Sequence, residues 1–293
     1  EFPRAAEIMA AFWERETGQV PDGVVSLDPV ALGYMLEGMP STDIGGIEVT
    51  ADNVAQVLLS DAYWEYPEPE RSDAFFALAS RELFGVLMSG DTAIVGGIEK
   101  AIGEGRFLLW SATGAEQELL VTTPLGAEWI ENEPALGVFL NDGSGSKIGY
   151  YIATSVDVVD RVCADGTVAA QDVAVTLSHG FDGDVADMPE YVSGGGTFVP
   201  AGEFHANLLV YPPQGLSLTE ATQDGETAML NGEIHHGRSL TSARIVLAPG
   251  DTTTVEYRFD ASGQPGARGD LAVTPGAASG NPEVDRSEAS ADC

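Results

Sequence analysis

The sequence predicts an α+β protein made of a mixed α/β domain, an immunoglobulin-like β-sandwich and an extended C-terminal tail. Over residues 1–133, apolar side chains recur at the spacing of amphipathic helices. Between residues 134 and 260 this period disappears, and short alternating runs stand between Gly and Pro turns, as in β-sandwiches. Residues 261–293 are rich in Gly, Pro, Ser and Asp, which is typical of an extended segment.

The first domain is expected to contain six helices and two short strands. Pro3 stands in the first turn of the first helix, and Asp28 is a natural N-cap because Pro29 follows it at the first helical position. On the fourth helix we expect Phe76 and Phe84 to point inward together with the other apolar residues. The helices are expected at 3–17, 29–36, 50–59, 70–88, 93–103 and 115–121, and the strands at 24–27 and 106–111.

The second domain is expected to consist of short strands joined by polar turns. Residues 141–146 read as a hairpin-like turn between two of these strands. His235 and His236 lie in a segment that reads as an exposed loop, and neighbours along a strand would point to opposite faces, which argues against a metal site. The strands are expected at 137–140, 148–152, 173–177, 207–211, 243–247 and 253–259.

The charge of the chain excludes two classes of partner. With 46 acidic and 13 basic residues, the net charge is −33. Nucleic acids and anionic membrane surfaces both require a basic footprint, so neither is an expected partner. The acidic surface is explained by solubility in a salty medium or by a face that binds cations. No apolar run is long enough to span a bilayer, so we expect no transmembrane segment in this chain.

Two cysteines indicate the compartment. Cys293 is the last residue, and chain ends fray unless something ties them down. A disulfide between Cys163 and Cys293 would do so and would persist only in an oxidising environment. The alternatives are two free thiols in a cytosolic protein, or pairing with another molecule. The cysteines favour a location outside the cytoplasmic membrane, either extracellular or in the cell envelope. No signal peptide is present, so an exported protein would begin as a longer precursor.

Two groups of residues are candidates for ligand binding. Tyr63, Trp64 and Tyr66 form an aromatic segment that is either a surface patch for a sugar or lipid chain or a lid packed on the core. The glycine-rich segment 141–147 lacks the spacing of a P-loop, and it stands between strands rather than before a helix. Its simplest interpretation is a turn. The candidate ligand-binding residues of this second group are Asn141, Asp142, Lys147 and Tyr150.

Several short motifs occur in an order that resembles a known family. They are EFPRAA at 1–6, DGVVSLDP at 22–29, TADNV at 50–54, VFLND at 138–142, SK at 146–147, PEYV at 189–192 and APG at 248–250. The chain resembles the C-terminal half of a family of uncharacterised, membrane-anchored exported proteins of actinobacteria, catalogued as a domain of unknown function. The resemblance extends along most of residues 1–260. It implies a separate N-terminal half, which would be a partner if it is cleaved off.

The α/β part is distantly similar to the LytR-CpsA-Psr transferases, which attach lipid-linked glycopolymers to the cell wall. The strand that ends at Asp28 and the helix from Arg71 to Phe84 occupy comparable places. The resemblance implies that Arg71 and Arg81 would hold a pyrophosphate and that Asp28 would hold a divalent cation such as Mg²⁺. Residues 58–66 carry no arginine, which leaves little positive charge for a diphosphate.

These observations lead to a functional prediction and an alternative. We predict an extracellular cell-envelope protein that binds or handles surface polysaccharide and assists the attachment of lipid-linked glycan. The alternative is a non-catalytic structural or adhesive surface module, which the poverty in His, Lys and Arg favours. A glycan hydrolase has no specific residue signal, because carboxylates are too abundant to single out a catalytic pair.

Overall fold

The computed structural model shows an α+β protein that divides into two compact units, Glu1–Glu128 and Trp129–Cys293. The expected domain boundary between residues 133 and 134 lies outside the described residues. The structure describes residues 2–88, 93–126, 135–263, 266–277 and 282–293.

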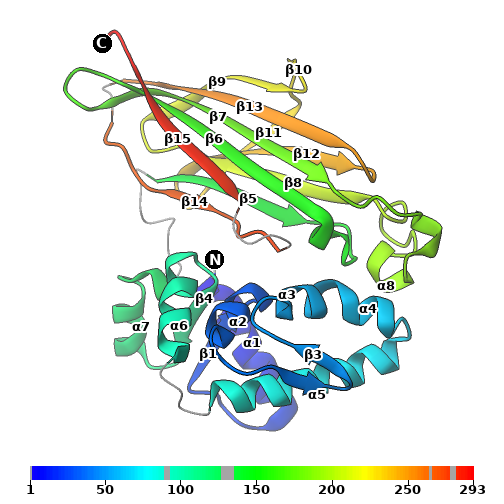
Figure 1. Cartoon of the computed structure of the whole chain (residues 1–293). Coiled ribbons are helices and arrows are strands. Elements are labelled where there is room, and N and C mark those ends of the chain that lie inside the picture. Colours follow the sequence, from blue (N-terminus) through cyan, green and yellow to red (C-terminus); the bar gives the residue numbers. More distant parts are fainter. Residues whose placement is uncertain (1, 89–92, 127–134, 264–265, 278–281) are drawn as a thin grey trace. The chain divides into compact units, whose positions relative to one another are not determined.

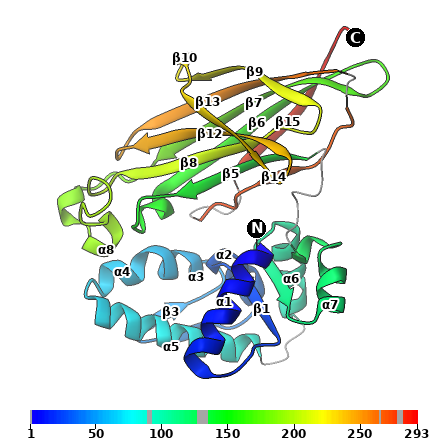
Figure 2. The same ribbon diagram turned by 180° about the vertical axis from the view of Figure 1, so that it is seen from behind.

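The first unit combines helices with two small antiparallel sheets, β1–β4 and β2–β3 (Figures 1 and 2). The expected third helix is a helical stretch interrupted by the π-helical turn η1, and the hairpin β2–β3 was not predicted. The elements are α1 (Phe2–Thr17), β1 (Gly23–Leu27), α2 (Pro29–Leu36), β2 (Thr42–Ile44), β3 (Ile47–Val49), α3 (Val54–Gln56), η1 (Val57–Asp61), α4 (Ala62–Glu65), α5 (Pro69–Leu87), α6 (Ala93–Gly103), β4 (Phe107–Ser111), α7 (Gly114–Leu120) and η2 (Pro124–Gly126).

Two packing features hold these helices. Asp28 is confirmed as the N-cap of α2, since its Oδ1 accepts a hydrogen bond from the backbone N–H of Ala31 at 2.8 Å. Helices α2 and α6 approach so closely at Gly97 that an added Cβ would clash with the backbone carbonyl of Tyr34. A larger residue at position 97 would therefore separate the two helices.

The second unit consists of two sheets (Figures 1 and 2). The larger has the order β10-β9-β13-β7-β6-β15, and the smaller has the order β11-β12-β8-β5-β14. An immunoglobulin-like topology stays a prediction. The elements are β5 (Leu136–Asp142), η4 (Ile148–Tyr151), β6 (Ile152–Val162), β7 (Val168–His179), η5 (Val185–Asp187), α8 (Glu190–Ser193), β8 (Phe204–Tyr211), β9 (Leu216–Gln223), β10 (Glu226–Thr227), β11 (Leu230–His235), β12 (Arg238–Leu247), β13 (Thr252–Ala261), β14 (Leu271–Val273) and β15 (Glu283–Ser290).

The hairpin expected around residues 141–146 is wrong. β5 belongs to the five-stranded sheet and pairs with β8 and β14, whereas β6 belongs to the six-stranded sheet. The segment 143–151 contains a short 3₁₀-helix and carries the chain from one sheet to the other. Polar, Gly-rich turns occur both in hairpins within one sheet and in connections between two sheets, so local composition does not distinguish these connections.

The segment around His235 and His236 is a tight hairpin rather than an exposed loop. His235 pairs with Arg238 across the β11–β12 ladder. His236 and Gly237 both have positive φ, 49° and 77°, as the two-residue hairpin turn of type I′ requires. The strand was missed because residues 231–235 are all solvent-exposed and mostly polar, which is also the pattern of a loop.

The expected tail supplies an edge strand to each sheet. β14 pairs in parallel with β5, and β15 pairs in parallel with β6 from Glu283↔Ser155 to Ser290↔Val162. Its composition favours an extended chain without internal contacts, but the free edges of β5 and β6 offer unpaired backbone groups that recruit it. The predicted disulfide is confirmed: Cys163 and Cys293 are joined. No helix within the described parts of the chain is both long and apolar enough to cross a bilayer.

A buried carboxylate holds the C-terminal segment in place. Asp160 is fully buried on β6. It forms ion pairs with Arg268 at 2.8 Å and Arg286 at 2.8 Å, and it accepts a hydrogen bond from Gln171 at 2.7 Å. Burial alone would raise the pKa of Asp160. The hydrogen bonds from Arg286 and Gln171 and the positive charges of Arg286 and Arg268 outweigh burial, so its pKa lies below the usual value.

We expect this cluster to make β15 sensitive to acid. Because the folded pKa of Asp160 is depressed, its contribution to stability is complete above the unfolded pKa of about 3.9 and is lost as the pH falls through the folded pKa. Asp160→Asn should speed hydrogen exchange of the β15 amides at pH 7. It should also reduce the acid-induced increase in β15 exchange that the wild-type protein shows below about pH 4. Asp182→Asn, at an exposed site of the same unit outside β6 and β15, should leave both unchanged. Equal effects of the two variants would contradict this role.

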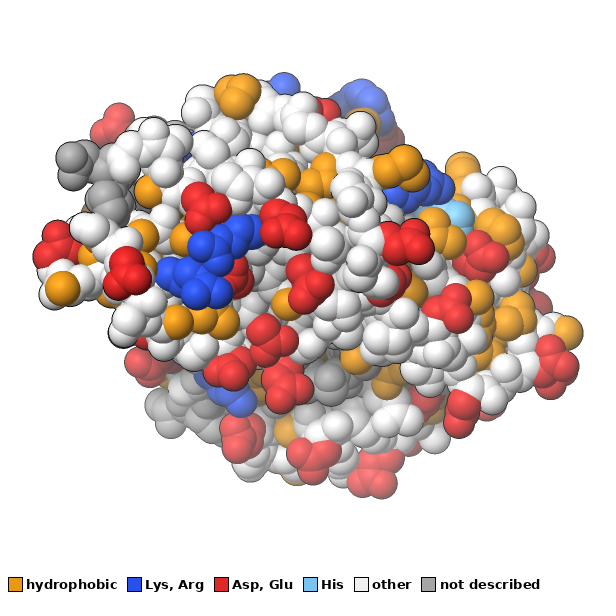
Figure 3. Space-filling view, turned by 90° about the horizontal axis from the view of Figure 1, so that it is seen from above, with side chains coloured by type: hydrophobic (Ala, Val, Ile, Leu, Met, Phe, Trp, Pro, Cys, Tyr) orange, Lys and Arg blue, Asp and Glu red, His pale blue; other side chains and the backbone are white. Residues whose placement is uncertain are grey.

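The surface reflects the composition of the chain. Figure 3 shows acidic side chains spread over one face, with basic side chains gathered in small groups among them. On the six-stranded sheet, an ion-pair network joins Asp172 to Arg161 at 2.7 Å and to Arg258 at 2.8 Å, and Arg258 also binds Asp260 at 2.9 Å. The arginines are thus engaged with carboxylates of the same sheet.

Candidate functional site

The aromatic segment of the first unit packs mainly against helix α5. The ring centroids of Tyr63 and Phe76 are 5.0 Å apart, and those of Tyr66 and Phe75 are 5.3 Å apart. The Tyr66 hydroxyl donates to the carbonyl oxygen of Gly45 at 3.4 Å. Tyr63 and Tyr66 therefore contribute to the interior of this unit. Trp64 is 37% exposed and is the member of the group that faces solvent most.

Beside Tyr63 the surface opens into a groove of about 420 Å³, which we call the apolar groove. This volume falls within the range of ligand pockets, about 300–1,000 Å³. Among the described lining residues, only Tyr63 and Ser80 add polar side-chain atoms to a wall that is otherwise aliphatic or aromatic. Its lining residues are Leu27, Pro29, Leu32, Leu58, Leu59, Tyr63, Phe76, Ala79, Ser80, Leu83, Phe84 and Leu87.

Helix α5 forms one wall because its apolar stripe is wider than the core needs. Phe76, Leu83 and Leu87 line the groove at helical spacing, while Phe75, Ala79 and Leu83 bury themselves in the core cluster of this unit. Phe84 was expected to point inward, and this is wrong, because it is 63% exposed at the groove. The width of the stripe is the signal that could have revealed the groove.

The opposite wall depends on the π-helical turn η1. Leu58 and Leu59 are consecutive residues, yet both line the groove, while Val57 and Ser60 are buried. The wider turn changes the angular spacing of side chains, which lets two neighbours reach one surface. π-Helical turns of this kind are frequent at functional sites. The sequence suggested only an ordinary helix here.

The arginines proposed for a diphosphate do not meet on α5. They are ten positions apart, which is about 15 Å along a helix. Arg71 lies 3.6 Å from Glu68 and over the Tyr66 ring at 5.3 Å. Arg81 binds Glu82 at 2.9 Å, with its side chain 75% exposed. Arg81 is not a lining residue of the apolar groove, but it lies three positions before Phe84 on α5, so these two side chains are neighbours on the helix surface.

Asp28 is engaged by protein partners at both carboxylate oxygens. Oδ1 caps α2, and Oδ2 accepts a hydrogen bond from Arg106 at 2.6 Å. The Arg106 side chain is fully buried and also binds Glu104 at 3.0 Å, which in turn accepts the Tyr34 hydroxyl at 2.7 Å. Burial, followed by the hydrogen bond to Glu104, raises the pKa of Tyr34 to about 12. Asp28 thus serves a structural ion cluster in this unit.

No group of three or more His, Cys, Asp or Glu side chains among the described residues is arranged to hold a metal ion. The role of Asp28 as a ligand of a divalent cation stays a prediction. Asp160, a fully buried carboxylate of the second unit, is surrounded by arginines and glutamine.

The candidate residues of the second unit lie at one end of the β-sandwich. Asn141 and Asp142 end β5, and Tyr150 belongs to the 3₁₀-helix η4. The Lys147 ammonium lies 5.7 Å from the Tyr191 ring on α8. The Tyr150 ring packs edge-on against Tyr151 at 5.2 Å. Asp142 lines a second cavity, inside the sandwich.

Comparison with known proteins gives one family match. Residues 1–63 match the model of a family described as "Protein of unknown function (DUF4012)". The matched segment comprises α1, β1 and α2 and continues through η1, including Leu58 and Leu59 of the apolar groove. No characterised protein in the curated collection matches the chain.

Some solved structures show a weak likeness over part of the chain. An M1 zinc metallopeptidase from Deinococcus radiodurans is 13% identical, with a TM-score of 0.21, over 39% of this chain and 21% of that one. A mutant of that enzyme bound to a Tyr-ser-ala substrate is 12% identical, with a TM-score of 0.20. A two-domain M1 zinc metallopeptidase mutant bound to L-arginine is 15% identical, with a TM-score of 0.21. At these scores neither fold nor activity transfers to this chain.

Proposed function

We propose that this chain acts outside the cytoplasmic membrane, in the cell envelope, where it binds lipid-linked surface polysaccharide and assists its attachment. The observation that carries the proposal is the apolar groove of the first unit. Burial of hydrocarbon in such a groove is favourable by about 25 cal/mol per Å². The disulfide between Cys163 and Cys293 supports an oxidising compartment.

Charge complementarity selects the head group of the ligand. The chain has only 13 basic residues against 46 acidic ones, so a basic side chain beside an apolar groove stands out. Arg81 is exposed, and its pair with Glu82 is a surface contact worth at most about 1 kcal/mol. A phosphate can therefore displace Glu82 at little cost. The proposed occupant is a polyprenyl chain, with its phosphate near Arg81 and its sugar outside the groove.

Binding of farnesyl phosphate, a short soluble polyprenyl phosphate, tests the proposal by titration calorimetry. Phe84→Glu should weaken binding at least tenfold, because it places a charge on the groove wall where the side chain is already exposed. Leu119→Glu is the matched control, since Leu119 is 68% exposed on α7 and is not a lining residue. Equal binding by both variants would rule the groove out.

The arginines are tested on the same probe. Arg81→Ala should weaken binding of farnesyl phosphate but not of farnesol, which lacks the phosphate. Arg71→Ala examines the residue that the resemblance to LytR-CpsA-Psr transferases indicates. An unchanged affinity for farnesyl phosphate in either variant removes that arginine from the head-group site.

The alternative, a structural or adhesive surface module, is favoured by a different observation. The ionic side chains Asp28, Arg71 and Arg81 are each paired with charged neighbours of the protein. If the wild-type chain does not bind farnesyl phosphate, the groove has no lipid role and the structural module becomes the better proposal.

A further inference from the structure

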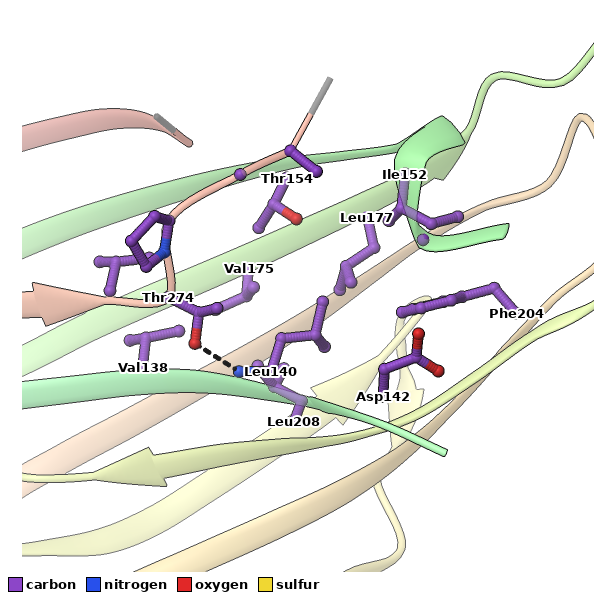
Figure 4. A pocket seen from close by; sticks show the side chains of 15 residues that line it. Val138, Leu140, Asp142, Ile152, Thr154, Val175, Leu177, Phe204, Leu208 and Thr274 are labelled. Atoms are coloured by element: carbon purple, nitrogen blue, oxygen red, sulfur yellow. Dashed lines mark hydrogen bonds between the residues drawn. The ribbon is translucent and has the colours of Figure 1, made fainter. Parts of the chain in front are cut away.

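The β-sandwich contains a separate cavity of about 210 Å³, which we call the sandwich cavity. It lies between the two sheets, and Figure 4 shows the side chains that converge on it. The lining residues are Val138, Leu140, Asp142, Gly149, Ile152, Thr154, Val175, Leu177, Phe204, Leu208, Val273, Thr274, Pro275, Gly276 and Ala277.

The interior of the sandwich cavity is apolar because alternate residues of each strand face inward. Leu140 on β5 stands opposite Leu208 on β8, and Thr154 on β6 stands opposite Leu177 on β7. Apolar cavities of about 150 Å³ lined by Leu, Ile and Phe remain dry and bind benzene. A cavity of this size therefore accommodates a hydrocarbon group somewhat larger than benzene.

One carboxylate stands at the end of this apolar space. Figure 4 shows Asp142 and Phe204 at one end of the cavity, and Val138 and Thr274 towards the other. The Asp142 Oδ1 atom accepts a hydrogen bond from the backbone N–H of Ser144 at 2.6 Å. Within the described parts of the chain, no hydrogen bond or ion pair engages the second oxygen, Oδ2.

Gly149 keeps this second oxygen accessible. A Cβ added at Gly149 would lie 3.3 Å from the Asp142 Oδ2 and 3.9 Å from the Phe204 ring. Any side chain at position 149 would therefore occupy the space between the carboxylate and the aromatic ring. With glycine there, a ligand atom can approach the carboxylate from the cavity.

The charge around the sandwich cavity selects a cation. The lining residues that the structure describes include no Lys or Arg. The Thr274 hydroxyl is used as an acceptor for the backbone N–H of Leu140 at 3.0 Å, the dashed line in Figure 4. A phosphate or a fatty-acid carboxylate would meet the negative charge of Asp142 without a compensating cation in the lining. An ammonium group would gain a charge-assisted hydrogen bond.

We propose that the sandwich cavity binds a small aliphatic amine. Its hydrocarbon part lies among Leu140, Leu177 and Leu208, and its ammonium group donates to the Asp142 Oδ2. The site is distinct from the apolar groove: it belongs to the other unit, and it takes a ligand of opposite charge. Its success or failure is therefore independent of the proposed lipid function.

Three six-carbon probes that differ only in their head group test the proposal on the full chain. By NMR titration, n-hexylamine should bind more tightly than 1-hexanol, and hexanoate should bind least. Asp142→Asn should weaken hexylamine binding about tenfold, because it removes the charge and keeps an oxygen for Ser144. Asp157→Asn, on the exposed face of β6, removes the same charge elsewhere and should leave the affinity unchanged.

The position of the ligand is tested without a variant and then with one. Hexylamine should shift the methyl resonances of Leu140, Leu177 and Leu208 in the wild-type protein. Gly149→Leu, which fills the space between the Asp142 carboxylate and the Phe204 ring, should abolish these shifts while the β-sheet circular dichroism signal is retained. Methyl shifts outside the cavity, hexanoate binding as tight as that of hexylamine, or an unchanged affinity in Asp142→Asn would each overturn the proposal.

Discussion

Cys293→Ser is expected to destabilise the second unit by about 4–5 kcal/mol, and to lower its melting temperature by roughly 10–20 °C. The disulfide to Cys163 closes a loop with a sequence separation of 130 residues, and in the chain-entropy model a loop of this length restricts the unfolded state strongly. Differential scanning calorimetry of the two proteins measures the difference. Cys293 is exposed, so its serine replacement creates no cavity.

The control is the same protein with the bond reduced. Reducing agent should lower the melting temperature of the wild-type chain to that of Cys293→Ser and should not affect the variant further. Hydrogen exchange should show where the loss begins. In the described part of the chain, β15 pairs with β6 alone, at the edge of its sheet, so its amides should exchange first once Cys293 is free. A wild-type melting temperature that does not change on reduction of the disulfide would contradict this account.

Features encoded locally were predicted well. Asp28 followed by Pro29 predicted the start of α2, and the structure confirms the cap. The expected helix at 93–103 coincides with α6. Cys293 at the chain end predicted the disulfide, because a terminal cysteine has few other uses. In each case the signal lies in a few adjacent residues, or in a residue type with one dominant role.

Features that depend on distant partners were not predicted. Residues 143–151 look like a hairpin turn, but the chain changes sheets there because β5 pairs with β8, more than sixty residues further on in sequence. β15 has the composition of a disordered tail and becomes a strand because β6 offers it a free edge. Strand partners are chosen by the whole fold, so a single sequence does not reveal them.

The candidate sites were predicted only in part, for a related reason. Tyr63 was selected from the sequence and does line the apolar groove, and Asp142 was selected and does line the sandwich cavity. Phe84 was interpreted as a core residue, because an apolar residue in a sequence gives the same signal whether it lines a groove or fills a core. Apolar sites become visible only when the fold leaves part of an apolar stripe uncovered.

Arg106→Met is expected to destabilise the first unit by about 1–3 kcal/mol, less than the full cost of leaving a buried charge unpaired, because water reaches both carboxylates that lose their partner. The Arg106 side chain is fully buried between Asp28 and Glu104, whose side chains are 36% and 20% exposed. Methionine fills similar space, so the loss comes from two carboxylates left without their cation. Urea denaturation followed by tryptophan fluorescence measures it, since Trp13, Trp64 and Trp110 all belong to this unit.

The matched control is Arg4→Met, which removes an arginine from the exposed pair with Glu7 on α1. Those side chains are 75% and 52% exposed, so water already screens the pair and the expected loss is at most about 1 kcal/mol. Adding Asp28→Asn to Arg106→Met should recover part of the lost stability. The second change removes the uncompensated charge of Asp28, while the amide oxygen still caps α2. If the double variant is less stable than Arg106→Met, the uncompensated charge of Asp28 is not the cause, and the packing of the Arg106 side chain holds β4 to α2 instead.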